Sequence, residues 1–184
     1  MDRPKGLCTP SGGHMHNDTE RRRHEACMRR AIEAAREGMR AGQGGPFGAV
    51  IADPTGEIIA VAHNEVLGTQ DCTMHAEVAA IRKAGRLDLR GCTLYATGFP
   101  CIMCLGAILW SRLSTLYYCN DYAAARVIGF DDAAFLEDVG RIFHCTPGTA
   151  EDMDLGHLAV RRLSLPEGAA LYDEWQAMPG HQMY

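Results

Sequence analysis

Four residues of types that bind metal ions or move protons lie in two short motifs. His75–Glu77 places a carboxylate two positions after a histidine, and Pro100–Cys104 carries two cysteines three positions apart. Imidazole nitrogen and thiolate sulfur are ligands that zinc prefers, and a set of one histidine and two cysteines leaves one position of a tetrahedral zinc open. An open position is typical of a catalytic rather than a structural site. Beside it, Glu77 can take a proton from water and pass it to a ring nitrogen or a departing amine.

The spacing of the two cysteines supports metal binding only in combination with the histidine motif. With 8 Cys in 184 residues, chance alone gives roughly a third of one C-x-x-C per chain. Cysteines three apart in the first turn of a helix lie on one face, and the helix N-terminus lowers their pKa toward the thiolate. A redox dithiol and a structural zinc with a distant fourth ligand remain the alternatives to a catalytic zinc.

The elements that must position these motifs follow from hydrophobic periodicity. Apolar residues after Asp18 recur at helical spacing and predict a first helix that ends at Gly42–Gly45. Two β-rich runs, Phe47–Ala52 and Glu57–His63, flank a turn sequence and predict an antiparallel hairpin. The remaining pattern predicts a loop at Asn64–Thr73, helices at Met74–Ala84, Cys101–Trp110, Tyr122–Val127, Asp132–Val139 and Pro166–Ala177, and strands at Thr93–Thr97, Ser114–Cys119 and Leu158–Leu165.

Strands that alternate with helices after an opening hairpin predict the α/β class. We expect a three-layer α/β/α sandwich with a central mixed five-stranded sheet, in which both metal motifs begin helices at one edge of the sheet. The length fits a single domain over residues 18–184. Residues 1–17 are rich in Gly, Pro, Ser and His without periodicity, and we expect them to be a disordered tail.

Composition excludes several classes of protein. A hydrophobic content of 47% argues against intrinsic disorder, and the chain has neither an apolar run long enough for a membrane span nor a secretory signal. A net charge of −5 argues against a nucleic-acid partner. We therefore expect a cytoplasmic protein, whose six scattered cysteines are small buried hydrophobic residues rather than disulfides.

The chain resembles the cytidine deaminase-like zinc deaminase superfamily and, within it, the bacterial and plant guanine deaminases. The zinc motifs carry the first resemblance, and the Gly-Phe-Asp-Asp sequence and the aromatic C-terminus carry the second. The matching segments are Gly44–Val50, Asn64, His75–Arg82, Pro100–Trp110, Ile128–Asp132 and the tail from Trp175 to Tyr184.

This resemblance implies zinc-dependent hydrolytic deamination of a purine base, above all guanine to xanthine with release of ammonia. It implies one Zn²⁺ per chain, held by His75, Cys101 and Cys104, with Glu77 as the catalytic proton shuttle. It also implies a homodimer, with the C-terminal helix and tail as candidates for exchange between subunits. The residues that would contact the base are Phe47, Asn64, Ala76, Trp110, Asp132 and Tyr184.

Among these contacts, Asp132 has the clearest chemical reason. An ionised carboxylate only accepts hydrogen bonds, so it suits the N1–H and 2-amino pair of guanine, whereas adenine or cytosine would present an acceptor. Each proposed contact also has a structural alternative: Asp131 or Asp132 as a helix cap, Phe47 and Trp110 as core residues, Asn64 as a turn former and Tyr184 as a frayed end.

The sequence departs from the guanine deaminase pattern at Gly98-Phe99, where that branch usually has Cys-Glu before the Pro-Cys. This departure affects the polarity around the metal ligands and leaves other substrates open. The alternatives are a deaminase of cytosine, guanosine or an ammeline-like triazine, a tRNA adenosine deaminase, and a zinc-binding interaction module without catalysis.

Overall fold

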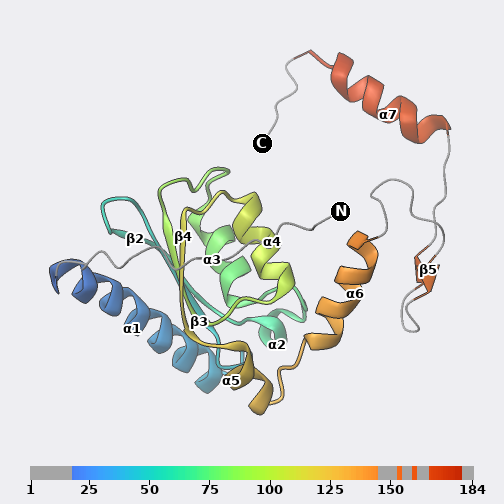
Figure 1. Ribbon diagram of the computed structural model, residues 1–184. Coiled ribbons are helices and arrows are strands. Elements are labelled where there is room, and N and C mark those ends of the chain that lie inside the picture. Colours follow the sequence, from blue (N-terminus) through green and yellow to red (C-terminus); the bar gives the residue numbers. More distant parts are fainter. Residues whose placement is uncertain (1–17, 145–152, 155–158, 161–165, 180–184) are drawn as a thin grey trace, which may run out of the picture.

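The computed structural model describes residues 18–144, 153–154, 159–160 and 166–179. Figure 1 shows a twisted sheet with helices on both faces. In chain order the elements are α1 (Asp18–Arg40), β1 (Gly48–Ala52), β2 (Ile58–His63), α2 (Val66–Thr69), α3 (Ala76–Ala84), β3 (Thr93–Gly98), α4 (Ile102–Trp110), β4 (Thr115–Asn120), α5 (Tyr122–Val127), α6 (Ala133–His144), β5 (Met153–Asp154), β6 (Ala159–Val160) and α7 (Pro166–Ala177).

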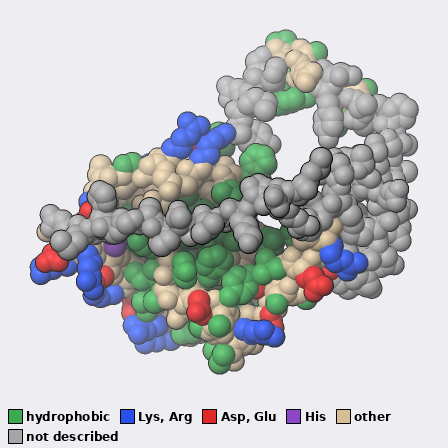
Figure 2. All heavy atoms as spheres, viewed as in Figure 1, with side chains coloured by type: hydrophobic (Ala, Val, Ile, Leu, Met, Phe, Trp, Pro, Cys, Tyr) green, Lys and Arg blue, Asp and Glu red, His purple; other side chains and the backbone are tan. Residues whose placement is uncertain are grey.

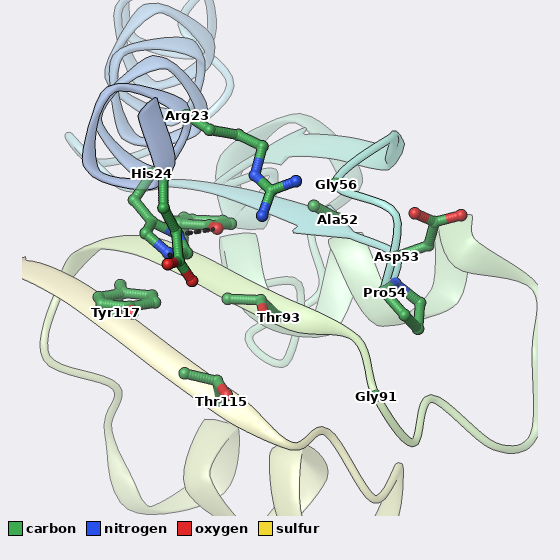
Figure 3. A pocket seen from close by; sticks show the side chains of 12 residues that line it. Arg23, His24, Ala52, Asp53, Pro54, Gly56, Gly91, Thr93, Thr115 and Tyr117 are labelled. Carbon is green, nitrogen blue, oxygen red and sulfur yellow. Dashed lines mark hydrogen bonds and ion pairs between the residues drawn. The ribbon is translucent and has the colours of Figure 1, made fainter. Parts of the chain in front are cut away.

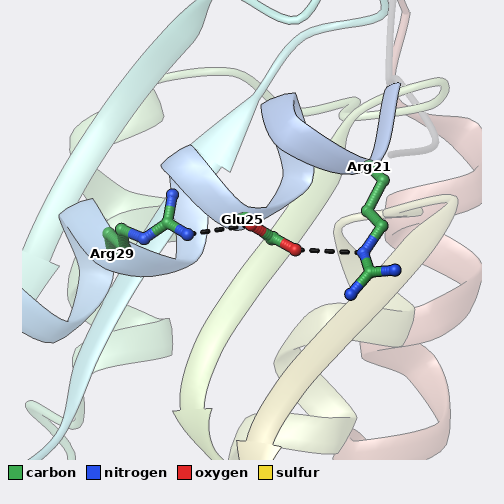
Figure 4. Close-up of polar contacts among 3 residues, drawn as sticks. All are labelled: Arg21, Glu25 and Arg29. Carbon is green, nitrogen blue, oxygen red and sulfur yellow. Dashed lines mark hydrogen bonds and ion pairs between the residues drawn. The ribbon is translucent and has the colours of Figure 1, made fainter. Parts of the chain in front are cut away.

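Helix α1 is amphipathic. A stripe that includes Cys27, Ala31 and Ala35 is buried against the sheet. On the opposite face the carboxylate of Glu25 accepts hydrogen bonds from Arg21 at 3.0 Å and from Arg29 at 2.8 Å, one turn before and one turn after it (Figure 4). These two guanidinium groups lower the pKa of Glu25. Such exposed pairs at i, i+4 spacing support the helix only slightly and keep this face solvated.

The main sheet has the order β2-β1-β3-β4. Strand β1 is buried along its whole length and pairs antiparallel with both β2 and β3, while β3 and β4 pair in parallel. Because successive side chains of a strand point to opposite faces, β1 contributes to two cores. Val50 packs with Cys27, Ala31 and Tyr95 beneath α1, and Ile51 packs with residues of α3 and α4 on the other face.

A glycine lets α1 approach the sheet closely. A Cβ at Gly48 would collide with the carbonyl oxygen of Ala31 and lie 2.8 Å from the backbone nitrogen of Ala35. Any larger residue at the first position of β1 would therefore displace the helix. The amide of Gly48 donates to the hydroxyl of Thr97 at 3.0 Å, which ties β1 to β3 at this end.

The predicted α/β class and the mixed sheet between layers of helices are confirmed. The main sheet has four strands in the described part of the chain, not the five expected. Of the predicted strand Leu158–Leu165, the described residues Ala159–Val160 form β6, which pairs antiparallel with β5 in a separate two-stranded ribbon. The predicted loop at Asn64–Thr73 contains the short helix α2. The expected tail at residues 1–17 lies outside the described residues, and no described helix is both long and apolar enough to span a membrane.

Candidate active site

The three predicted metal ligands lie at the starts of two neighbouring helices. His75 is the residue before α3 and Cys101 the residue before α4, and both have extended backbone angles. Neither side chain caps its helix, so both are available as ligands. Cys104 lies in the first turn of α4 and is fully buried. The sequence expectation that the two motifs begin helices at one place in the fold is confirmed.

The spacing of these side chains fits a zinc ion. Nδ1 of His75 lies 3.5 Å from Sγ of Cys101, and the ligand atoms of the three residues all lie within 4.8 Å of one another. A tetrahedral zinc with bonds of about 2.0 Å to nitrogen and about 2.3 Å to sulfur separates its ligand atoms by about 3.6–3.8 Å. Within the described residues, this is the only cluster of three such side chains.

Electrostatics prepare one thiolate in this cluster. The pKa of Cys101 lies well below its usual range, chiefly because its sulfur lies beside the Cys104 thiol, and also because it contacts the His75 ring. The same contact and burial raise the pKa of Cys104. The hydrogen bond to Cys101 also raises the pKa of His75, although burial opposes it. Metal binding to such a set therefore displaces a proton from Cys104, as zinc does when it binds a thiol.

Glu77 is placed beside the ligands without being one of them. It lies in the first turn of α3 with 7% of its surface exposed, and its Oε2 accepts a hydrogen bond from Sγ of Cys104 at 3.5 Å. Burial is the main reason that the pKa of its carboxyl group is raised. A carboxyl group whose pKa is raised toward neutral pH can both accept and return a proton.

The metal cluster, by which we mean the three side chains His75, Cys101 and Cys104, lies at a cavity of about 300 Å³ with a largely aromatic wall. Phe47 and Phe130 meet edge to face there, with ring centroids 4.8 Å apart and an interplanar angle of 87°. Aromatic walls of this kind accept a flat, apolar-faced ligand. The lining residues are Phe47, His75, Glu77, Phe99, Cys101, Tyr122, Ala125, Gly129, Phe130, Asp131, Asp132 and Phe135.

Two consecutive aspartates at this cavity have different roles. Oδ1 of Asp131 accepts from the amide of Ala133, the first residue of α6, at 3.1 Å, and its Oδ2 pairs with Nε of Arg126 at 2.8 Å. Asp132 directly precedes α6, but its side chain accepts a hydrogen bond from the hydroxyl of Tyr122 at 2.7 Å. The side chain of Asp132 therefore makes no hydrogen bond to the helix among the described residues, and it is available to a ligand.

Of the residues expected to contact the base, some lie on the cavity wall and others do not. Phe47 and Asp132 line the cavity. Asn64 is buried; its backbone amide donates to the carbonyl of Phe47, and its side-chain oxygen accepts from the amide of Val66. Ala76 is buried at the start of α3. Neither Asn64 nor Ala76 is on the cavity wall.

Trp110 and Tyr184 are not brought to the cavity by the described structure. Trp110 is the last residue of α4, is 75% exposed and lines a separate surface hollow with Leu109 and Arg112. Successive helical residues are rotated by about 100°, so a residue nine positions after Cys101 lies about 180° from it around the helix. The proposed contact of Tyr184 lies outside the described residues.

Sequence reasoning missed several residues of the cavity wall. Phe99 was noted only as a departure before Pro100, yet its ring lines the cavity. Tyr122, Phe130 and Phe135 also line it. Phe130 belongs to the Gly-Phe-Asp-Asp sequence, which could have indicated its place. Tyr122 carries no such signal, because its role depends on a contact ten residues away.

A second cavity of about 300 Å³ lies where α1 crosses the other end of the sheet (Figure 3). Its polar side chains serve one another: Nδ1 of His24 lies 2.7 Å from the hydroxyl of Tyr95, and Arg23 donates to the carbonyl of Thr55 at 3.1 Å. The rings of His24 and Tyr117 also pack, with centroids 4.6 Å apart. These contacts join α1, the β1–β2 turn and the sheet, which is a structural role.

A set of metal-binding side chains beside a buried carboxylate and an aromatic-walled cavity suits hydrolysis of an amino group from a planar ring. By class, the molecule is a zinc-dependent hydrolytic deaminase. Residues 21–120 match the family model of the cytidine and deoxycytidylate deaminase zinc-binding region. The chain belongs to this family.

Comparison with individual proteins extends the likeness beyond the matched region. The chain is 45% identical to the guanine deaminase of Bacillus subtilis over 122 residues, which are 64% of this chain and 78% of that protein. The crystal structure of that enzyme superimposes with a TM-score of 0.77, covering 88% of this chain and 98% of the other at 36% identity. A guanine deaminase from Nitrosomonas europaea gives a TM-score of 0.54 at 31% identity, covering 59% of this chain and 64% of the other. A tRNA-specific adenosine deaminase of Aquifex aeolicus is 46% identical over 91 residues, which are 46% of this chain and 60% of that protein.

Proposed function

We propose that this protein deaminates guanine hydrolytically, so that guanine and water give xanthine and ammonia. The observation that carries the proposal is the position of Asp132 on the wall of the cavity that also contains His75 and Glu77. A carboxylate that only accepts hydrogen bonds matches a ring edge that only donates them, and N1–H with the 2-amino group of guanine is such an edge. The likeness to two guanine deaminases supports the same substrate.

The residues of this chain divide the reaction between them. His75, Cys101 and Cys104 would hold the zinc, which when bound supplies a Lewis acid that makes water a better nucleophile at neutral pH. Glu77 takes one proton of the attacking water on its carboxylate and delivers it to ring nitrogen N3 of the base. It then moves the remaining proton of the added hydroxyl group to the 2-amino group. The C2–O bond forms first, and the bond from C2 to the exocyclic amino nitrogen then breaks, so that ammonia leaves and the oxygen becomes the C2 carbonyl of xanthine.

The cavity wall orients the base and excludes water. Phe47 and Phe130 present their rings to the cavity, and Asp132 accepts hydrogen bonds from the edge of the base that carries the leaving group. An apolar wall strengthens the hydrogen bonds of Asp132 and the proton transfers of Glu77, because fewer waters compete when the base fills the cavity.

Adenosine editing in tRNA is the second candidate, favoured by the similarity to the Aquifex aeolicus enzyme. Adenine presents its N1 lone pair where guanine presents a donor, and this pairs poorly with the Asp132 carboxylate. Residues 167–184 contain no Lys or Arg, which are the side chains that bind a phosphate backbone. An interaction module without catalysis would have no use for a buried Glu77 beside an open metal position.

A substrate panel tests the proposal. The zinc-loaded protein is incubated with guanine, guanosine, cytosine, ammeline and adenosine-containing tRNA, and the released ammonia is measured. We expect guanine to give the largest kcat/KM. Faster turnover of any other compound in this panel would contradict the assignment, and no release from any of them would contradict deamination itself.

A homodimer is also part of the proposal. Hydrophobic side chains gather on the face where β4 and α5 lie (Figures 1 and 2). Val127, Ile128 and Tyr118 are 86%, 56% and 49% exposed. Apolar surface of this extent is typical of protein interfaces. On its outer side, β4 pairs with no strand of the described part, and Figure 1 places α7 apart from the sandwich.

We further propose that residues 182–184 complete the cavity of the partner subunit. Subunits with Glu77→Gln and an intact tail are mixed with subunits that retain Glu77 but lack residues 182–184, and the dimers are allowed to exchange. Activity should return in the mixture if the tail acts in trans, since one site then has both Glu77 and a tail. A mixture as inactive as its components would contradict exchange, and a monomer by light scattering would contradict the dimer.

The expected cytoplasmic location remains a proposal. Six cysteines of the described residues are free. Of the scattered cysteines expected to be buried, Cys27 and Cys92 are buried, but Cys72 and Cys119 are exposed, which corrects the expectation for these two. Free exposed thiols persist in a reducing compartment. Fractionation of the native host cells would test the location, and recovery of the protein outside the cytoplasm would contradict it.

A further inference from the structure

A tyrosine next to the metal cluster is hydrogen-bonded to the carboxylate that reads the substrate. Tyr122 begins α5, and its hydroxyl donates to Oδ2 of Asp132 at 2.7 Å, although ten residues separate the two in sequence. Both side chains line the cavity. Hydrogen bonds to a charged acceptor are stronger than neutral ones, so this contact restricts the orientation of the carboxylate.

A row of aromatic rings restricts Tyr122 in turn. Its ring packs against Phe99 with centroids 5.6 Å apart, and Phe99 meets Tyr118 edge to face at 5.0 Å. The backbone of Phe99 is fixed as well, because its amide donates to the carbonyl of Asn120 at 2.7 Å. Phe99 lies two residues before the metal ligand Cys101, so the row connects the metal-binding segment to Asp132.

Among the described residues, Tyr122 is the only side chain that donates a hydrogen bond to Asp132. The neighbouring Asp131 is held by Arg126 and by the amide of Ala133, whereas Oδ1 of Asp132 has no hydrogen-bond partner among the described residues. One oxygen of Asp132 is thus fixed, and the other remains for a ligand. Burial first, and then the bond to Asp132, raises the pKa of Tyr122, which keeps its hydroxyl protonated as a donor.

We propose that Tyr122, supported by Phe99, is a positioning residue that aims the carboxylate of Asp132 at the donor edge of the base and so sets substrate selectivity. The inference rests on the proposed guanine deaminase function. It also gives a role to the aromatic residue that stands before Pro100, because the ring of Phe99 supplies a packing surface for Tyr122.

The primary test compares Tyr122→Phe with Tyr118→Phe in the zinc-loaded full chain. Both variants lose one hydroxyl from the same row of rings, but the Tyr118 hydroxyl has no hydrogen-bond partner among the described residues. We expect Tyr122→Phe to lower kcat/KM for guanine about tenfold, mainly through KM, because a charge-assisted hydrogen bond is lost. Zinc content and Tm should match those of Tyr118→Phe, and the kinetics of Tyr118→Phe should match the wild type.

Selectivity provides a readout that a merely structural role would not change. 2,6-Diaminopurine keeps the 2-amino group but presents N1 as an acceptor, so a fixed Asp132 carboxylate disfavours it. As a competitive inhibitor it should bind the wild type more weakly than guanine does, and Tyr122→Phe should narrow this preference several-fold. An equal loss of affinity for both compounds would overturn the inference.

A double substitution tests whether Tyr122 acts through Asp132. In an Asp132→Ala background, Tyr122→Phe should change kcat/KM less than twofold, since the hydroxyl no longer has its acceptor. Full additivity of the two losses would refute a positioning role. If the wild type deaminates guanine and Tyr122→Phe equals Tyr118→Phe, the inference fails and the function stands. If the wild type does not act on guanine, both fail.

Discussion

Substitution of Glu77 by glutamine separates proton transfer from metal binding. Glutamine has nearly the same shape, and its side-chain oxygen can accept the hydrogen bond that Cys104 donates to Oε2 of Glu77 at 3.5 Å. Zinc content and folding should therefore be preserved. The side-chain amide neither gains nor loses a proton at neutral pH, so it cannot carry a proton from water to the base.

The burial of Glu77 determines the expected size of the effect. General acid–base groups contribute about 10²–10⁴-fold to rate, which corresponds to about 2.7–5.4 kcal/mol of activation free energy. Because only 7% of Glu77 is exposed, bulk water has little access to replace it. We therefore expect a loss in kcat in the upper part of that range, about 10³–10⁴-fold.

The assay measures ammonia release from guanine together with zinc content by elemental analysis. Glu57→Gln is the matched control, because Glu57 is exposed in the turn between β1 and β2 and makes no contact with the cavity. The control should retain full kcat. If Glu77→Gln kept its zinc and a kcat within about threefold of the wild type, far less than an acid–base group contributes, the shuttle would have to be another residue.

Three further outcomes follow from the structure. Cys104→Ala should lower bound zinc from about one per chain to near zero and abolish ammonia release; retained zinc would contradict the ligand assignment. Gly48→Ala should lower the free energy of unfolding in urea by about 1–3 kcal/mol, because the new methyl group lies 2.8 Å from the Ala35 nitrogen; an unchanged midpoint would contradict the close approach of α1. Hydrogen bonds from Thr55 lower the pKa of Asp53, so its charge stabilises the fold above the unfolded value of about 3.9, and this contribution is lost as the pH falls through the lower folded value. Asp53→Asn should therefore reduce Tm at pH 7 and less so at pH 3, and a constant difference would refute the linkage.

The sequence predicted those features that depend on neighbouring residues. His75, Cys101 and Cys104 belong to short motifs at the beginnings of helices, and both the motifs and the helices were visible in the local pattern. The sandwich and its hairpin were predicted from segments with the hydrophobic spacing of strands that alternate with segments with the spacing of helices. The short helix α2 was missed because four residues carry too little periodicity to be distinguished from a turn.

Contacts between distant residues were not predictable in the same way. The bond from Tyr122 to Asp132 and the packing of Phe99 depend on how α5 and α6 return to the metal cluster, which no local pattern records. Trp110 was expected at the base because of the resemblance to guanine deaminases. Its angular position relative to Cys101, however, already indicated the opposite side of α4. A helical projection of residues 101–110 therefore predicts that Trp110 points away from the metal ligand Cys101.

The residues that would bind metal and move protons come before most of the cavity wall in the sequence. The family match ends at residue 120, and up to that point the cavity receives His75, Cys101 and Glu77, which bind metal and move protons. Seven of the twelve lining residues, from Tyr122 to Phe135, come after it. The reactive half of the enzyme can thus stay constant while the following fifteen or so residues diverge. A transplant of residues 121–135 between family members would then move these seven wall residues together, while Phe47 and Phe99 stay with the recipient. This makes the segment a natural starting point for evolving deaminases with new bases.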